Sequence, residues 1–135
     1  MLEMRSNGRE VVARLANFRE LLTPALLEAE SKSLDAVQHS AVDYMYSQMI
    51  DPQGPLEDAF YQVIEVGANS ISGQLVNPLD YAWRQEEGFS GMTDSLGRFF
   101  SWTPEYHYMQ KSLQAQLPTI EQYFSDAVAE SLDAL

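Results

Sequence analysis

A run of helix-breaking residues, Asp51-Pro-Gln-Gly-Pro55, divides this sequence into two parts with different hydrophobic periodicity. Before it, apolar residues recur at steps of three and four, which is typical of amphipathic helices. After it, the segments Tyr61–Val66 and Ile71–Val76 have the β-branched and aromatic content of strands. Gly67-Ala-Asn-Ser70 between them indicates a hairpin connection. The chain therefore has to combine helices with a small antiparallel sheet.

The first 50 residues are expected to be helical. Thr23-Pro24 offers an N-cap residue followed by a proline at the first helical position. The sequence leaves open whether Pro24 kinks one long helix or divides two, and we expect a short helix followed by a long one that ends near Met49. The apolar face of the short helix comprises Val11, Val12, Leu15, Phe18, Leu21 and Leu22, and that of the long one Leu27, Leu34, Val37, Ala41, Tyr44 and Met45.

Beyond the hairpin, Leu79–Gln85 is expected to form a short helix that Gly88 stops. Residues 89–97, rich in glycine, serine and threonine, are predicted to be an exposed, mobile loop. A further strand is expected over Arg98–Trp102.

A C-terminal helix is expected from about Pro104, broken near Leu117-Pro118. Its buried face should comprise Ile120, Tyr123, Phe124, Ala127, Val128 and Leu132. The predicted fold is α+β: a single domain over residues 1–135, with a long N-terminal helix and a C-terminal helix packed on a small antiparallel β-sheet.

Composition narrows the class of protein. A chain of 135 residues with 45% hydrophobic and 11% aromatic residues can bury one core. No apolar run approaches the roughly 20 residues of a membrane span, and Glu3 and Glu10 interrupt the basic-then-apolar order of a signal peptide. The absence of cysteine excludes disulfides and thiolate chemistry and favours a reducing cytoplasm.

The net charge of −12 lies in residues 33–135, which hold Arg84, Arg98 and Lys111 against fifteen acidic residues. Such a surface repels the phosphate backbone of nucleic acids. Three interpretations follow: solubility alone, an inhibitor that mimics DNA, or a component that lets DNA pass without binding it.

No constellation indicates catalysis. His39 and His107 lack further ligands at metal spacing, so no metal or cofactor is expected. Glu86 and Glu87 are adjacent and point about 100° apart on a helix, so they suit a solvated helix edge or an anchor for a partner's cation rather than an acid–base pair. Aromatic and arginine side chains dominate protein–protein interfaces. The candidate interface therefore comprises Tyr81, Trp83, Arg84, Glu86, Glu87, Phe89, Arg98 and Trp102.

The order of these segments resembles the tail-completion, or head-to-tail joining, proteins of long-tailed double-stranded DNA phages. The matching pieces are Gly54-Pro55-Leu56, the strand pair, Tyr81-Ala82 with Glu86 and Gly88, and Tyr106-His-Tyr-Met-Gln-Lys-Ser-Leu113. The sequence departs from the family pattern at Pro55, at the extra glutamate, and at Thr103-Pro-Glu-Tyr106 before His107.

The resemblance implies a virion protein made in the host bacterial cytoplasm and without catalytic activity. It implies a homo-oligomeric ring of six copies that docks on phage connector and tail proteins, with DNA only as non-specific cargo and no membrane partner. The alternative is a small acidic inhibitor that mimics DNA and blocks a host nucleic-acid-binding protein. An enzyme is the third class, and it lacks a nucleophile, metal or cofactor signature.

Overall fold

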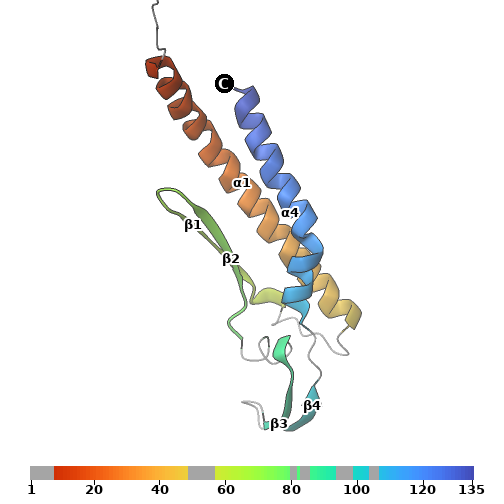
Figure 1. Ribbon diagram of the computed structural model, residues 1–135. Helices are drawn as coiled ribbons and strands as arrows, with labels where there is room; N and C mark the ends of the chain where they lie inside the picture. Colours follow the sequence, from red (N-terminus) through yellow and green to blue (C-terminus); the bar gives the residue numbers. More distant parts are fainter. Residues whose placement is uncertain (1–7, 49–56, 80–81, 83–85, 94–98, 104–106) are drawn as a thin grey trace, which may run out of the picture.

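The computed structural model describes residues 8–48, 57–79, 82, 86–93, 99–103 and 107–135 (Figure 1). It has an α+β architecture, as predicted: a long N-terminal helix and a C-terminal helix packed against a small two-stranded antiparallel sheet. A second hairpin lies at one end of the helix pair (Figure 1). The elements are α1 (Gly8–Gln48), β1 (Tyr61–Val66), β2 (Ile71–Val76), β3 (Phe89–Thr93), β4 (Phe99–Thr103) and α4 (Tyr108–Asp133).

Helices α1 and α4 run antiparallel and share the most extensive contact in the fold (Figure 1). Small side chains are buried along it: Ala29 and Ser33 on α1, and Ala127 and Ser131 on α4. Each buried serine hydroxyl donates to the carbonyl four residues earlier, Ser33 to Ala29 at 2.7 Å and Ser131 to Ala127 at 2.8 Å. These bonds satisfy the hydroxyls within their own helix, so the two backbones can approach without burying an unpaired polar group.

The expected division of both helices at proline is wrong. Pro24 lies inside the continuous α1 and Pro118 inside the continuous α4. A proline within a helix removes one backbone donor and crowds the preceding turn, which destabilises the helix without forcing it to end. The Thr23 hydroxyl donates to the Arg19 carbonyl at 3.0 Å, a bond back into its own helix rather than the predicted N-cap.

The first hairpin has the predicted strands and connection. Tyr61 pairs with Val76 and Val66 with Ile71, and the Gly67 amide donates to the Ser70 carbonyl at 2.7 Å. An isolated two-stranded hairpin is marginally stable in water, and this one packs along α1. Side-chain hydrogen bonds also join the hairpin to α1. Arg19 donates to the Ala68 carbonyl at 2.7 Å, and Gln62 donates to Asp35 and Gln38 at 2.8 and 3.0 Å.

The core lies where both helices meet the base of the first hairpin. It is formed by Ala41, Met45, Phe60, Ala82 and Tyr108. Tyr108 is fully buried, and its hydroxyl donates to the Ala82 carbonyl at 3.3 Å. Burial, and to a smaller extent the Glu86 carboxylate, raises the pKa of this hydroxyl well above its ordinary value. The core therefore fixes Ala82 against the start of α4.

The predicted loop over residues 89–97 is wrong in its first half, because Phe89–Thr93 forms β3 and pairs with β4. The register sets Phe89 opposite Thr103 and Met92 opposite Phe100. The strand expected over Arg98–Trp102 is confirmed as β4, shifted by one residue. The segment Phe-Ser-Gly-Met-Thr is too short to show a clear alternation of apolar and polar residues, and its glycine and serine are typical of loops. It forms a strand because it pairs with β4.

The predicted helix faces are only partly buried. Ala127 is buried, whereas Val128 and Leu132 are 38% and 53% exposed. At the start of α1, which lies beside the end of α4 (Figure 1), Val11 and Leu15 are 46% and 62% exposed. Apolar stripes on both helices thus extend beyond what the fold covers. Among the described residues, neither helix combines the length and apolar character needed to cross a membrane.

Candidate functional site

Four of the eight candidate interface residues, Tyr81, Trp83, Arg84 and Arg98, lie outside the described residues. The other four are brought into one region, the junction between the segment at Glu86 and the second hairpin. Glu86 and Glu87 are helical, and Phe89 begins β3. Trp102 of β4 lies opposite Ser90 of β3. Sequence positions 13 to 16 residues apart thus meet at the base of the hairpin.

Glu86 has a role within the chain. Its carboxylate accepts hydrogen bonds from the amides of Met109 and Gln110 at 2.9 and 3.1 Å, and its carbonyl accepts from the His107 amide at 3.1 Å. These amides lie at the first turn of α4, which has no intrahelical acceptors for them. A carboxylate there also meets the positive end of the helix dipole. Glu86 is therefore a helix cap supplied from elsewhere in the chain, a role that neither sequence interpretation included.

His107 is the residue that directly precedes α4. Its backbone has φ 50° and ψ 39°, in the left-handed region that few non-glycine residues adopt. The hydrogen bond from the His107 amide to the Glu86 carbonyl holds this conformation. The His107 carbonyl accepts a hydrogen bond from the Lys111 amide at 2.8 Å. The residue turns the chain into α4 while its backbone groups stay bonded.

Gly88 separates the capping segment from the second hairpin. Its φ of 77° is in the region that favours glycine, which agrees with the predicted helix stop. The exposed Glu87 precedes it and β3 follows it directly. Glu87, Phe89 and Trp102 therefore occupy the point at which the second hairpin leaves the body of the protein.

The second hairpin stands apart from the other elements. β3 and β4 pair with each other, and among the described elements neither has an extensive contact with a helix or with the first sheet. Figure 1 shows them beyond the end of α1 and α4 that is opposite the chain's C-terminus. An isolated two-stranded hairpin is marginally stable in water.

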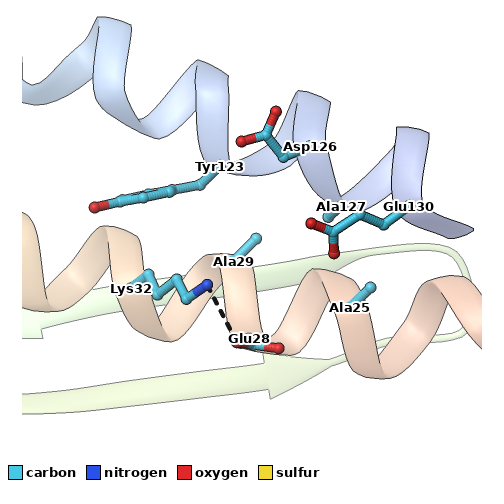
Figure 2. A pocket seen from close by; sticks show the side chains of 8 residues that line it. All are labelled: Ala25, Glu28, Ala29, Lys32, Tyr123, Asp126, Ala127 and Glu130. Atoms are coloured by element: carbon cyan, nitrogen blue, oxygen red, sulfur yellow. Dashed lines mark ion pairs between the residues drawn. The ribbon is translucent and has the colours of Figure 1, made fainter.

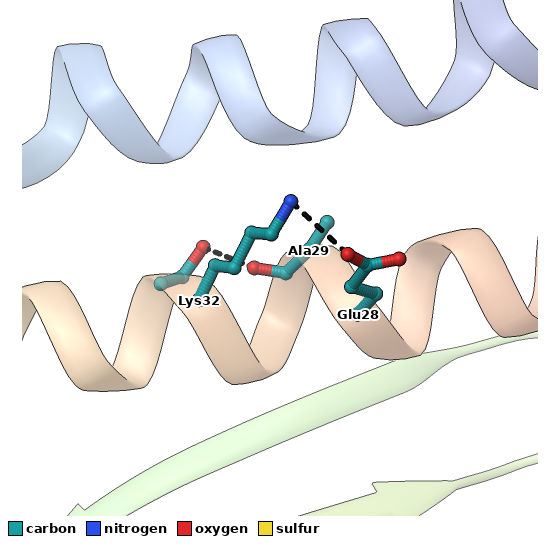
Figure 3. Close-up of polar contacts among 4 residues, drawn as sticks. Glu28, Ala29 and Lys32 are labelled. Atoms are coloured by element: carbon teal, nitrogen blue, oxygen red, sulfur yellow. Dashed lines mark hydrogen bonds and ion pairs between the residues drawn. The ribbon is translucent and has the colours of Figure 1, made fainter.

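A small polar depression lies between α1 and α4, with a volume of about 70 Å³. Figure 2 shows Lys32 and Glu28 from α1 below Tyr123, Asp126 and Glu130 from α4. Lys32 Nζ is 3.1 Å from Glu28 Oε1 and 6.0 Å from the centre of the Tyr123 ring. Figure 3 shows the Glu28–Lys32 pair beside the Ala29 carbonyl that Ser33 engages.

This depression does not have the features of a catalytic centre. The hydrogen bond and charge of Glu28 raise the pKa of Lys32, which keeps the ammonium protonated and unfit as a base. The pair is solvent-exposed, so it contributes little to stability. Among the described residues no group of histidine and carboxylate side chains could hold a metal ion. We interpret the depression as part of the helix contact.

His39 is also a surface residue in the structure. Its Nε2 lies 3.4 Å from Asp43 Oδ2, one helical turn on, and both side chains are largely exposed. Tyr46, farther along α1, donates to Glu57 at 2.5 Å, and this hydrogen bond is the main cause of its raised pKa. The described partners of His39 thus include no second metal ligand.

An apolar groove that the sequence analysis did not predict lies beside the first hairpin. α1 forms its floor, β2 one wall and α4 the other, and its volume is about 480 Å³. Leu113 and Leu117 on the α4 wall are 47% and 45% exposed. Steps of four, three and four link Leu113, Leu117, Ile120 and Phe124, a signal that the expected break at Pro118 concealed.

Comparison with known protein families, with curated proteins and with solved structures finds no match to this chain.

Proposed function

We propose that this chain is a structural protein of the neck of a long-tailed phage. Its copies assemble into a ring that joins the head connector to the tail. The observation that carries the proposal is the second hairpin, which leaves the body at Gly88 without a described element to cover it. Such a hairpin gains stability when a neighbouring subunit buries it. Glu87, Phe89 and Trp102 at its base belong to the proposed contact.

The order of elements also supports a neck protein. A long helix, a hairpin, a helical segment stopped by glycine, a second hairpin and a C-terminal helix follow one another in the chain. The family resemblance in the sequence implied a long N-terminal helix, a strand pair and a C-terminal helix in this order. It also implied the segment Tyr81-Ala82 with Glu86 and Gly88, of which Ala82, Glu86 and Gly88 lie next to the core and the α4 cap.

The charge of the chain suits a conduit for DNA. A net charge of −12 repels phosphate groups, so DNA can pass a ring of such subunits without a lasting contact. In this proposal the partners are further copies of the chain and the phage connector and tail proteins. The protein is made in the host cytoplasm and resides in the virion. It binds no membrane and catalyses no reaction.

Electron microscopy of particles assembled with and without this chain tests the proposal. We expect DNA-filled heads without tails when the chain is omitted, and complete particles when it is added back. Complete, stable particles formed in its absence would contradict the neck assignment.

The alternative, an inhibitor that mimics DNA, makes an opposite prediction in a competition assay. A mimic should displace DNA from a host DNA-binding protein, and the displacement should weaken as salt is raised. A neck component should leave the activity of that protein intact. Potent, salt-sensitive displacement by the purified chain would favour the alternative.

A further inference from the structure

The N-terminal part of α1, here called the arm (Gly8–Phe18), is a helix that the rest of the chain hardly covers. None of its residues is buried, and Val12 and Leu15 are 66% and 62% exposed. Helices of this length are marginal in water unless an apolar face is packed. Val11, Leu15 and Phe18 follow one another at steps of four and three, so the arm offers one apolar stripe to a partner.

The groove beside the first hairpin has the complementary shape. Its α4 wall presents Leu113, Leu117 and Ile120, with the same steps of four and three, and the α1 floor adds Leu34 and Val37. A second cavity of about 520 Å³, lined by Leu22, Leu26 and Phe124 among others, lies farther along α1 beside the hairpin turn. An amphipathic helix commonly binds in a groove of this kind through residues spaced three or four apart.

The charges of arm and groove are opposite. The arm carries Arg9 and Arg14 against Glu10, a net charge of 2 − 1 = +1, and the remaining residues carry −12 − 1 = −13. Glu30 lies in the groove floor, where burial raises its pKa, and it forms no ion pair with a described residue. The described residues that line this groove include no lysine or arginine. Two arms packed on each other would instead bring like charges together.

We propose that the arm of one copy packs into the groove of a second copy of this chain. Val11, Leu15 and Phe18 would meet Leu113, Leu117 and Ile120, and an arm arginine would approach Glu30 of the second copy. The contact joins two different surfaces, so its repetition closes a ring or extends a filament. This inference rests on the proposal that the chain assembles with itself, and it assigns the surfaces involved.

Disulfide trapping tests the contact, because the chain has no cysteine of its own. Two single variants, Leu15→Cys in the arm and Leu113→Cys in the groove, are mixed and oxidised at high protein concentration. We expect a covalent heterodimer, located by peptide mass spectrometry. The matched control is Ala115→Cys, an exposed position on α4 that does not line the groove. Its cross-link to Leu15→Cys should be several-fold weaker.

Three results would overturn the contact: equal trapping of the control, a product dominated by Leu15→Cys paired with itself, or no cross-link. Glu30→Gln supplies an independent readout. It removes the negative charge of a partly buried carboxylate from the groove, so it should reduce trapping several-fold while circular dichroism shows an intact fold. If the arm and groove cysteines fail to cross-link in particles that nevertheless join tails normally, the contact is wrong and the neck role remains. Tails joined without the chain would sink the neck role itself.

Discussion

Glu86, which the sequence analysis placed in a candidate interface, stabilises the fold by capping α4. Two amides at the first turn of α4 donate to its carboxylate, so its removal leaves both without an acceptor. We expect Glu86→Ala to lower the free energy of unfolding by about 1–2 kcal/mol. Glu86→Gln, which keeps an acceptor oxygen and loses the charge, should lie between. Urea denaturation measures both changes.

Glu87 is the matched control for this prediction. It is adjacent, acidic and exposed, and it makes no cap bond to α4. Glu87→Ala should change the unfolding free energy by about 0.5 kcal/mol or less. An equal loss in the two variants would show that the carboxylate of Glu86 does not cap the helix.

Glu30 links local packing to pH. Burial raises its pKa in the folded protein above the unfolded value, so the folded state binds more protons between those two values. The unfolding free energy contributed by this group therefore falls as pH rises from about 4.5 through the folded pKa. Glu30→Gln should be more stable than the wild type at pH 7.

The difference between Glu30→Gln and wild type should shrink as pH is lowered and vanish below about pH 4, where Glu30 is protonated in both states. Urea midpoints measured from pH 4 to pH 7 check this dependence. A pH-independent difference would rule out desolvation of the carboxylate as the cause. The Glu30 carboxyl group packs closely against Gly73 of β2. A Cβ atom at Gly73 would lie only 2.8 Å from the Glu30 carboxyl carbon.

At the scale of elements, the two helices show which sequence signals carry the fold. Periodic apolar residues predicted helices on both sides of Pro24 and of Pro118, and the strand segments and their turn predicted the first hairpin residue for residue. The breaks expected at the two prolines do not occur. The stabilisation from tertiary packing on either side of a proline can exceed the roughly 3 kcal/mol by which it destabilises a helix.

The interior of α1 gives a direct test of that balance. Pro24→Ala restores a backbone donor for the Glu20 carbonyl and should raise the unfolding free energy by about 1–3 kcal/mol, with unchanged helix content by circular dichroism. Pro78→Ala, at an exposed position outside helices and strands, is the control and should have little effect. A loss of stability in Pro24→Ala would favour two separate helices.

Close contact between α1 and α4 depends on small residues, of which periodicity singled out Ala127 but not Ala29. Ala29→Leu would force a larger side chain between the helices and should cost about 1–3 kcal/mol. The same substitution at Ala13, which is exposed on the same helix, should be nearly neutral. Thermal unfolding compares the two, and equal effects would contradict tight packing at Ala29.

The candidate site was less predictable than the fold. Composition located the segment from Glu86 to Trp102, but it could not show that Glu86 caps a helix 23 residues later. It could not show that Phe89–Thr93 forms a strand either, because that depends on pairing with Phe99–Thr103. The groove depends on contacts among α1, β2 and α4, which no local pattern encodes.

Across the molecule, the fold leaves apolar side chains of the arm exposed at one end of the helix pair. The second hairpin stands free of the other described elements at the opposite end (Figure 1). Exposed apolar side chains of the arm gain nothing in water, and a contact between copies would bury them. This exposure supports the proposal that the chain acts by assembly.

A cryo-electron microscopy reconstruction of the neck of the complete virion would show whether this chain joins the head to the tail. We expect copies of the α1–α4 pair arranged around the DNA channel, with each second hairpin buried against a neighbouring subunit. Density that accommodates no copy of this chain, or copies that touch neither one another nor the connector and tail, would contradict it.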